Sequence, residues 1–171
     1  METTASVLAA TPLQGIVFGL LTLPICLWVA YTDLSTMKIR NEAVIAMFVV
    51  FVVAGFFVIT PATDYLWRFA HLAVILAIGF VLSMIGAVGA GDAKFAAAMA
   101  PFVALADWQA VLVIFCVLLI VTWVLHRLAR MIPAVRNLAP NWQSWTEKKD
   151  FPMGVTLAAT QLTYLGLAAT G

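Results

Sequence analysis

The sequence predicts an all-α fold: a polytopic transmembrane helix bundle of about six spans, built as one domain over residues 1–171. Two observations support this prediction. Hydrophobic residues make up 64% of the chain and charged residues only 10%, whereas a soluble domain carries about 25% charged residues. The apolar residues also form long runs, and a helix of about 20 such residues crosses the roughly 30 Å hydrocarbon core of a bilayer.

Six apolar segments, separated by short breaks that contain polar residues, glycine or proline, are the predicted helices. They cover residues 13–32, 42–60, 69–88, 93–106, 109–128 and 152–170. The fourth segment is the shortest, about 21 Å long at 1.5 Å per residue. We therefore expect it to cross a thinned part of the bilayer or to begin inside the bundle. In the first segment, Gly15 and Gly19 form a GxxxG pattern that allows another helix to pack closely.

Basic residues are distributed unevenly between the two sides of this predicted bundle. Eight of the nine lysines and arginines fall on one side, which the positive-inside rule assigns to the cytoplasm. These eight are Lys38, Arg40, Lys94, Arg127, Arg130, Arg136, Lys148 and Lys149. Arg68 is the ninth, on the opposite side. Six spans then place both termini outside, and Asp64 and Asp107 are interpreted as solvated residues of short outer turns.

The composition gives no support to several classes of function. A net charge of +1 is no basis for nucleic-acid binding. Cys26 and Cys116 lie inside apolar segments, so we interpret them as packing residues rather than as metal ligands or a disulfide. The polar segment 127–150 is expected to lie on anionic membrane lipid. The alternative is that Glu147 and Asp150, within it, hold a basic segment of a substrate.

Two aspartates stand at helix ends on the predicted cytoplasmic side. Asp33 closes the first apolar segment, and Asp92 follows Gly89 and Gly91 directly before the fourth. Although the two are far apart in sequence, the topology places them at the same depth. Packing of the first, third and fourth helices would therefore bring their carboxyl groups together. The purely structural interpretation of Asp92 is that it caps the helix that follows it.

A pair of carboxyl groups in a partly dehydrated pocket is suited to peptide hydrolysis. The two cannot both ionise cheaply, so one stays protonated while the other is a carboxylate. The carboxylate takes a proton from a bound water, and the acid donates a hydrogen bond to the scissile carbonyl. This chemistry needs no metal and no cofactor. Gly89 and Gly91, which lack a Cβ atom, would let an extended substrate pass close to Asp92.

These segments resemble those of a known family. Residues 89–95, GAGDAKF, are similar to the GxGD signature of membrane aspartyl proteases and, among them, of the type IV prepilin peptidases. Residues 33–41, DLSTMKIRN, resemble the first aspartate motif of these enzymes, which ends in Ile-Pro-Asn. Arg40 stands here in place of the proline. Residues 151–154, FPMG, resemble a Pro-x-Gly segment near the end of the family's chains, so the similarity covers nearly the whole sequence in order.

The resemblance implies a function and assigns roles to residues. Asp33 and Asp92 would be the catalytic aspartates of an endopeptidase, and Gly89 and Gly91 would shape its site. Lys94 would lower the pKa of Asp92 or bind a substrate carbonyl, or else be an ordinary interfacial lysine. The substrate would be a prepilin or pseudopilin. It would be cut between its basic leader and its apolar helix, at the cytoplasmic face of a bacterial inner membrane.

The larger bacterial members of this family carry a cytoplasmic insert with paired Cys-x-x-Cys motifs, and this chain has neither. It therefore resembles the short form that serves tight-adherence (Flp-type) pili, with peptidase activity and without N-methyltransferase activity. The archaeal preflagellin peptidases share the paired aspartates, so a flagellin-type substrate stays open. The sequence does not indicate an oligomeric state.

Two other classes of function stay open. Acids within membrane segments are typical of transporter or channel components, but no acid lies near the middle of a predicted span here. His71 and His126 lie near helix ends and are interpreted as interfacial residues. A catalytically silent subunit of a secretion assembly would have the same topology, although the presence of both Asp33 and Asp92 favours an active enzyme.

Overall fold

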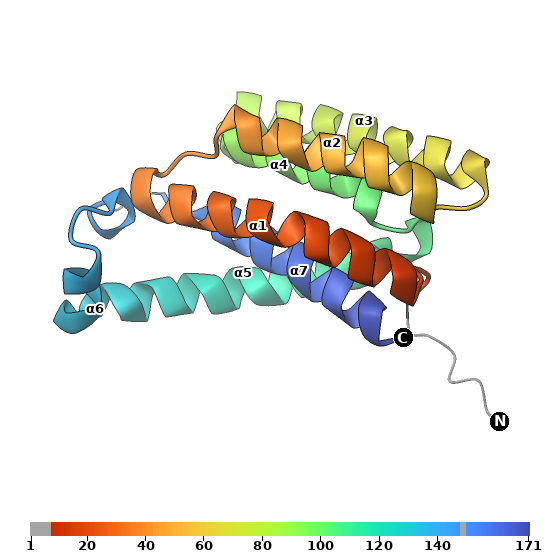
Figure 1. The fold of residues 1–171 in the computed structure, drawn as a ribbon. Helices are drawn as coiled ribbons and strands as arrows, with labels where there is room; N and C mark the ends of the chain where they lie inside the picture. The colour runs from red at the N-terminus through yellow and green to blue at the C-terminus, as the bar shows by residue number, and fades with distance from the viewer. Residues whose placement is uncertain (1–7, 148–149) are drawn as a thin grey trace.

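The computed structural model describes residues 8–147 and 150–171, which fold into seven α-helices and three 3₁₀ turns (Figure 1). The α-helices are α1 Pro12–Thr36, α2 Asn41–Val58, α3 Ala62–Met84, α4 Ala90–Met99, α5 Trp108–Met131, α6 Pro133–Leu138 and α7 Met153–Thr170. The 3₁₀ turns are η1 Ala100–Phe102, η2 Leu105–Asp107 and η3 Gln143–Trp145. No residue in the two described ranges lies in a β-strand, so the predicted all-α fold class is confirmed.

Within residues 8–147 and 150–171, four helical segments are long and apolar enough to cross a membrane. They are α1, α2, α3 and the continuous stretch Leu105–Met131, most of which is α5. The other two predicted spans lie in the interior of the bundle: α7 has 18 residues, nine of them buried, and α4 has only 10. The fold is thus a helical membrane bundle in which α4 and α7 form a central pair.

The chain departs from the predicted fourth helix over residues 93–106. α4 ends at Met99, and η1 and η2 then turn the chain toward α5. Pro101 has no N–H to donate, so it cannot continue the α-helical hydrogen bonds. Its carbonyl instead accepts a hydrogen bond from the buried Arg68 guanidinium at 3.1 Å. The prediction of one continuous helix here is therefore wrong, because hydropathy does not register a proline turn inside apolar sequence.

The third helix is displaced from its predicted position over residues 69–88. α3 begins at Ala62, where Asp64 lies in the first turn and its charge interacts favourably with the helix dipole. It ends at Met84, and Gly86 then adopts a φ of 72°, which favours glycine. Because the start of α3 contains polar residues, a search for apolar runs does not detect its first two turns.

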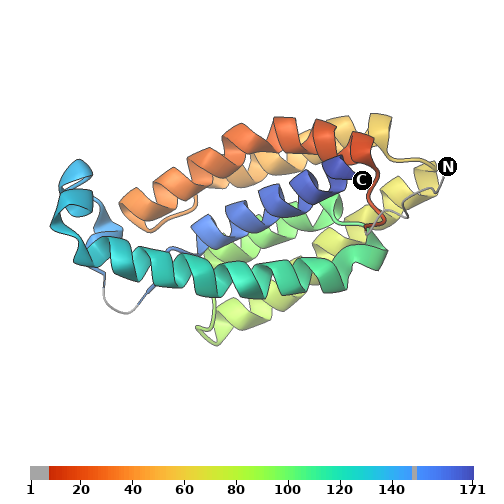
Figure 2. The ribbon, with the colours of Figure 1, turned by 90° about the horizontal axis from the view of Figure 1, so that it is seen from below.

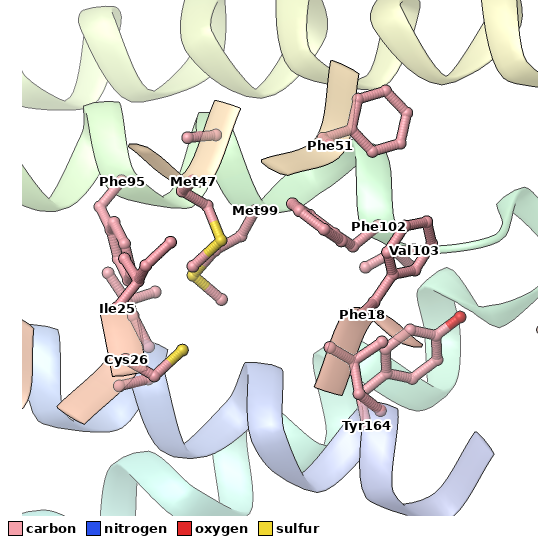
Figure 3. Close-up of a cluster of buried hydrophobic side chains, with 14 of the residues drawn as sticks. Phe18, Ile25, Cys26, Met47, Phe51, Phe95, Met99, Phe102, Val103 and Tyr164 are labelled. Carbon is pink, nitrogen blue, oxygen red and sulfur yellow. The ribbon is translucent and has the colours of Figure 1, made fainter. Parts of the chain in front are cut away.

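The helices are arranged in two layers (Figure 1). α2, α3 and α4 form one layer, and α1, α5 and α7 form the other; Figure 2 shows the second layer from below. Aromatic side chains join the layers (Figure 3): the Phe102 ring packs edge-to-face on Phe18 and Phe51, with centroids 4.9 and 5.3 Å apart. The layers also meet where α4 packs on α7. The first turn of α1 and the last turn of α7 lie at the end of the bundle opposite α6.

The GxxxG pattern of α1 supports close packing within the chain. At Gly15 the backbone of α7 approaches so closely that a Cβ atom would overlap the Ala169 nitrogen and lie 2.7 Å from the Leu165 oxygen. At Gly19 the nearest atom to such a Cβ is the Leu165 Cβ, at an ordinary 3.8 Å. One glycine of the pair is therefore required by the α1–α7 contact, and the other is not.

Gly15→Ala is expected to destabilise the fold, whereas Gly19→Ala should not. The added methyl at position 15 meets main-chain atoms that cannot rotate away, so α7 must shift, at a cost of about 1–3 kcal/mol. The methyl at position 19 has room, and alanine favours the helix over glycine. Thermal unfolding in detergent measures both variants. Equal melting temperatures for the two would contradict the close approach at Gly15.

The interpretation of Asp107 as a solvated residue is wrong. Its side chain is only 4% exposed, and its carboxylate accepts hydrogen bonds from the Ala9 and Ala10 nitrogens at 2.7 and 3.0 Å. It also accepts one from the Tyr164 hydroxyl at 2.8 Å. These bonds tie the chain before α1 to the end of α7, so the carboxylate is a structural group. Asp64, by contrast, is exposed as predicted.

Candidate active site

Asp33 lies in the last turns of α1 and is buried, with only 5% of its surface exposed. Its Oδ2 atom accepts a hydrogen bond from the Gly154 N–H, with 2.6 Å between nitrogen and oxygen. α1 ends at Thr36, and the left-handed conformation of its C-cap, Met37 (φ 53°), reverses the chain and brings Ile39 back toward the same glycine. The first turn of α7 and the last turns of α1 thus hold this carboxyl group from two sides.

Asp92 lies in the first turn of α4, which begins at Ala90 and has Gly89 as its N-cap. A Cβ atom at position 89 would lie 2.5 Å from the Asp92 Oδ2, so a larger residue there would force this carboxyl to move. Its other oxygen, Oδ1, is buried and has no hydrogen-bond partner within residues 8–147 and 150–171. An unpaired buried acceptor is costly, so this atom is available to a proton or to a bound molecule.

Both aspartates line one cavity of about 670 Å³ at the end of the bundle away from the start of α1. The loop from Gly86 to Gly89 forms one wall. The segment that leads into α7 forms another and contributes Glu147 and Asp150, which are the acids that the sequence suggests for holding a basic substrate segment. α1 and α4 thus bring two carboxyl groups that are remote in sequence to a single polar cavity.

The environment of Asp92 favours its protonated form. Burial, together with the charge of the neighbouring Asp33 carboxylate, raises the pKa of Asp92 from 3.8 to about 7, while a hydrogen bond to its own backbone opposes the shift. Asp33 is also buried, but the backbone N–H groups of Gly154 and Val155 that face it stabilise its carboxylate form. At neutral pH the cavity can therefore hold one acid and one carboxylate.

Asp92→Asn is expected to stabilise the fold above neutral pH. Because Asp92 has a raised pKa of about 7 in the folded chain, the folded state binds this proton more tightly than the unfolded state. The resulting stability is complete below about pH 4 and is lost as the pH rises through 7. Asparagine has no charge to bury, so at about pH 8.5 the variant should be more stable by roughly 1–3 kcal/mol.

Thermal unfolding in detergent at several pH values measures this effect. The gain in melting temperature should shrink toward about pH 4, and the exposed Asp64→Asn variant should show no such trend. A gain that is the same at every pH would mean that the Asp92 charge is not the cause.

The other predicted site residues lie at different distances from the cavity. Gly89 lines it, whereas Gly91 faces Ile39, whose Cβ lies 3.4 Å from the place that a Cβ atom at position 91 would take. Lys94 is exposed and donates to the Asn41 Oδ1 at 3.4 Å, outside the cavity lining. Burial and the charge of Asp33 raise the pKa of Asp92, and Lys94 is not among the groups that shift it.

Gly154 is a site residue that reasoning from the sequence did not assign. A Cβ atom there would lie 2.9 Å from the Asp33 Oδ2 and 3.0 Å from the Ile39 Cδ1. The glycine therefore serves both as a hydrogen-bond donor and as a space for the carboxyl group. The signal available in the sequence is the Pro-x-Gly segment at 151–154.

A family model described as the type IV leader peptidase family matches residues 20–125. This region is more than half of the chain and contains both Asp33 and Asp92. The chain belongs to the type IV leader peptidase family. The resemblance of the two aspartate segments is thereby confirmed, and membership in a family of peptidases makes the chain a leader-peptidase-like membrane protein. No curated protein and no solved structure matched the chain. α7 and Gly154 lie outside the matched region.

Membership in this family implies a prepilin as the general class of substrate. No group of three or more histidine, cysteine or acidic side chains in the described ranges is arranged to hold a metal ion. The ionisable residues that line the cavity are Asp33 and Asp92, together with Lys38, Glu147 and Asp150.

Proposed function

We propose that this chain is an aspartyl endopeptidase that removes the leader peptide from type IV prepilins. The observation that carries the proposal is the presence of Asp33 and Asp92, on α1 and α4, in one polar cavity. Both belong to the segments that match the leader peptidase family. The substrate preference that we propose is for Flp-type prepilins or pseudopilins, because the chain has the short form without the cysteine-containing insert.

The two carboxyl groups would divide the work of peptide hydrolysis. Asp33, facing backbone N–H donors, acts as the base that takes a proton from a bound water. Asp92, whose pKa is about 7, is the acid that hydrogen-bonds and then protonates the scissile carbonyl oxygen. The hydroxide adds to the carbonyl carbon and gives a tetrahedral gem-diol. As the C–N bond breaks, the proton held by Asp33 passes to the leaving amine, and one gem-diol hydroxyl returns its proton to Asp92. Water is consumed, and both aspartates return to their starting forms.

The distribution of charge supports a site at the cytoplasmic face of the inner membrane. Lys38 lines the cavity, and Arg127, Arg130 and Arg136 lie at the same end of the bundle, near α6. A positive end is retained in the cytoplasm, so the start of α1 and the end of α7 would face the outside. The leader of a prepilin, which is basic and cytoplasmic, would then reach the acids Glu147 and Asp150.

Two rival functions lead to different expectations. A transporter or channel component would need ionisable groups along a path across the bundle, but both aspartates lie at one end of it. A silent assembly subunit would need no acid with a raised pKa and a free oxygen, and burying Asp92 in that state lowers stability. Both features favour an active peptidase.

Co-expression of the chain with an Flp-type prepilin tests the proposal. We expect the prepilin to be shortened at the junction of leader and apolar helix, with a new N-terminus that carries no methyl group by mass spectrometry. Cleavage by the purified protein should persist in EDTA, because the proposed chemistry uses no metal. A prepilin that stays at full length, across several Flp-type candidates, would refute the function; a methylated product would refute only the absence of methyltransferase activity.

A further inference from the structure

A second cavity, of about 170 Å³, has a lining that contains neither aspartate. Its lining is almost entirely apolar. Helices α4 and α7 supply its floor, and α3 and α5 supply its walls. The lining includes Ile75 of α3, Ala96 of α4, Leu112 of α5, and Leu157 and Gln161 of α7.

The groove follows from how the two layers meet. On one side of the bundle α1 packs on α2, and in the centre α4 packs on α7. On the other side α3 packs mainly on α4, and α5 mainly on α7, while α3 and α5 are not a closely packed pair in the described part of the chain. The two outer helices thus leave a groove between them, and in a membrane this groove opens toward lipid.

Gln161 is a polar residue in the otherwise mostly apolar lining of the groove. The side chain is 1% exposed, and its Nε2 donor has no hydrogen-bond partner among the residues that the structure describes. A buried amide without a partner is expensive in apolar surroundings. A lipid acyl chain offers no acceptor, whereas a polypeptide helix offers carbonyl and side-chain oxygens. The groove therefore suits a helix that carries an acceptor better than it suits lipid.

Both floor helices begin at the aspartates. α4 carries Asp92 in its first turn and Ala96, in the groove, one turn later. α7 donates to Asp33 from Gly154 and carries Leu157, also in the groove, about one turn later. One turn advances a helix by about 5.4 Å. A chain that is cut beside the aspartates and continues into the membrane would thus enter the groove directly after the cut.

We propose that this groove binds the apolar helix of the substrate, with the Gln161 amide donating a hydrogen bond to it. The inference rests on the proposed function, since it takes the substrate to be a prepilin whose apolar helix follows the cut. It adds a specificity-determining site that lies apart from the catalytic pair. Interhelical hydrogen bonds from glutamine are a recognised source of helix association in membranes.

Site-specific photocrosslinking tests the groove. A photoreactive residue replaces Leu112, which lines the groove and is 55% exposed, or Val117, which is on the same helix, is 54% exposed and does not line it. Each variant is co-expressed with the same Flp-type prepilin, in chains with and without Asp92→Asn. We expect a crosslink to the prepilin's apolar helix from position 112 and much less from 117. Equal yields, or none from 112, would overturn the proposal.

Crosslinking tests substrate binding in the groove, and the cleavage assay tests the peptidase function, so one result can be negative without the other. Cleavage without a crosslink from position 112 would support the peptidase function and contradict substrate binding in the groove. A crosslink without cleavage would keep the groove as a helix-binding site and remove the peptidase function.

Gln161→Met tests the hydrogen bond with a side chain of similar length. We expect the KM for the prepilin to rise by about threefold to tenfold while kcat changes little. The crosslink from position 112 should weaken in parallel. An unchanged KM would overturn the role of Gln161. If thermal unfolding shows that this variant is not folded, the crosslink from Leu112 alone decides the proposal.

Discussion

Asp33→Asn and Asp92→Asn are each expected to abolish leader removal, lowering the cleavage rate by about 10³-fold or more. Asparagine keeps the size of the side chain but can neither take the proton from water nor give one to the scissile carbonyl. The loss should lie in kcat, because the groove and the cavity walls that we propose to bind substrate are otherwise unchanged. Gel mobility of a co-expressed prepilin measures the endpoint, and initial rates with the purified protein in detergent measure the size of the loss.

Asp64→Asn is the matched control, since Asp64 is an exposed aspartate in the first turn of α3, at the opposite end of the bundle. It should cleave normally. Asp107→Asn is not a suitable control because the buried Asp107 carboxylate accepts three hydrogen bonds. Normal processing by either the Asp33 or the Asp92 variant would refute the assignment of both as catalytic residues.

Gly154→Ala is expected to reduce cleavage by about 10²-fold or more while the protein stays folded. The added methyl would lie 2.9 Å from the Asp33 Oδ2 and 3.0 Å from the Ile39 Cδ1, so the carboxyl group must move away from its backbone donor. A shift of about 1 Å in a catalytic group is enough for a loss of this size. Cleavage rates and thermal unfolding, measured on the same preparation, separate the loss of activity from a loss of fold.

Gly166→Ala provides the comparison on the same helix. A Cβ atom at Gly166 has no neighbour within 4 Å, so alanine there should leave cleavage unchanged and favour α7 slightly. If both alanine variants cleave at the rate of the parent chain, Asp33 does not depend on its contact with Gly154, and the role given to that glycine is wrong.

Much of the bundle could be predicted because a transmembrane helix is a local property. The cost of moving each residue into lipid depends on that residue alone, so apolar runs locate α1, α2 and α5 closely. The errors in helix position occur where the hydropathy of neighbouring residues does not indicate where a helix begins or ends. Apolar sequence continues across Pro101, so it does not locate the end of α4, and polar residues at the start of α3 conceal two of its turns.

The candidate site could be predicted in part for the same reason. Asp33 and Asp92 stand at the ends of apolar segments, and their depth and side follow from the segments and from the positive charges. The partner of Asp33 could not be derived in this way, because Gly154 lies 121 residues further along the chain. The burial of Asp107 could not be derived from the sequence either, because its hydrogen-bond partners Ala9 and Tyr164 lie near the two ends of the chain.

The order of residues alone establishes that the chain enters a membrane, which end is positive, and that two acids share one depth. These follow from energies that add up residue by residue. The packing of α1, α4 and α7 establishes the rest: one cavity for both acids, the protonated form of Asp92, and a groove around Gln161. Ionisation and hydrogen bonding depend on which helices touch, and that is a property of the folded bundle, because a buried charge responds to neighbours from any part of the chain.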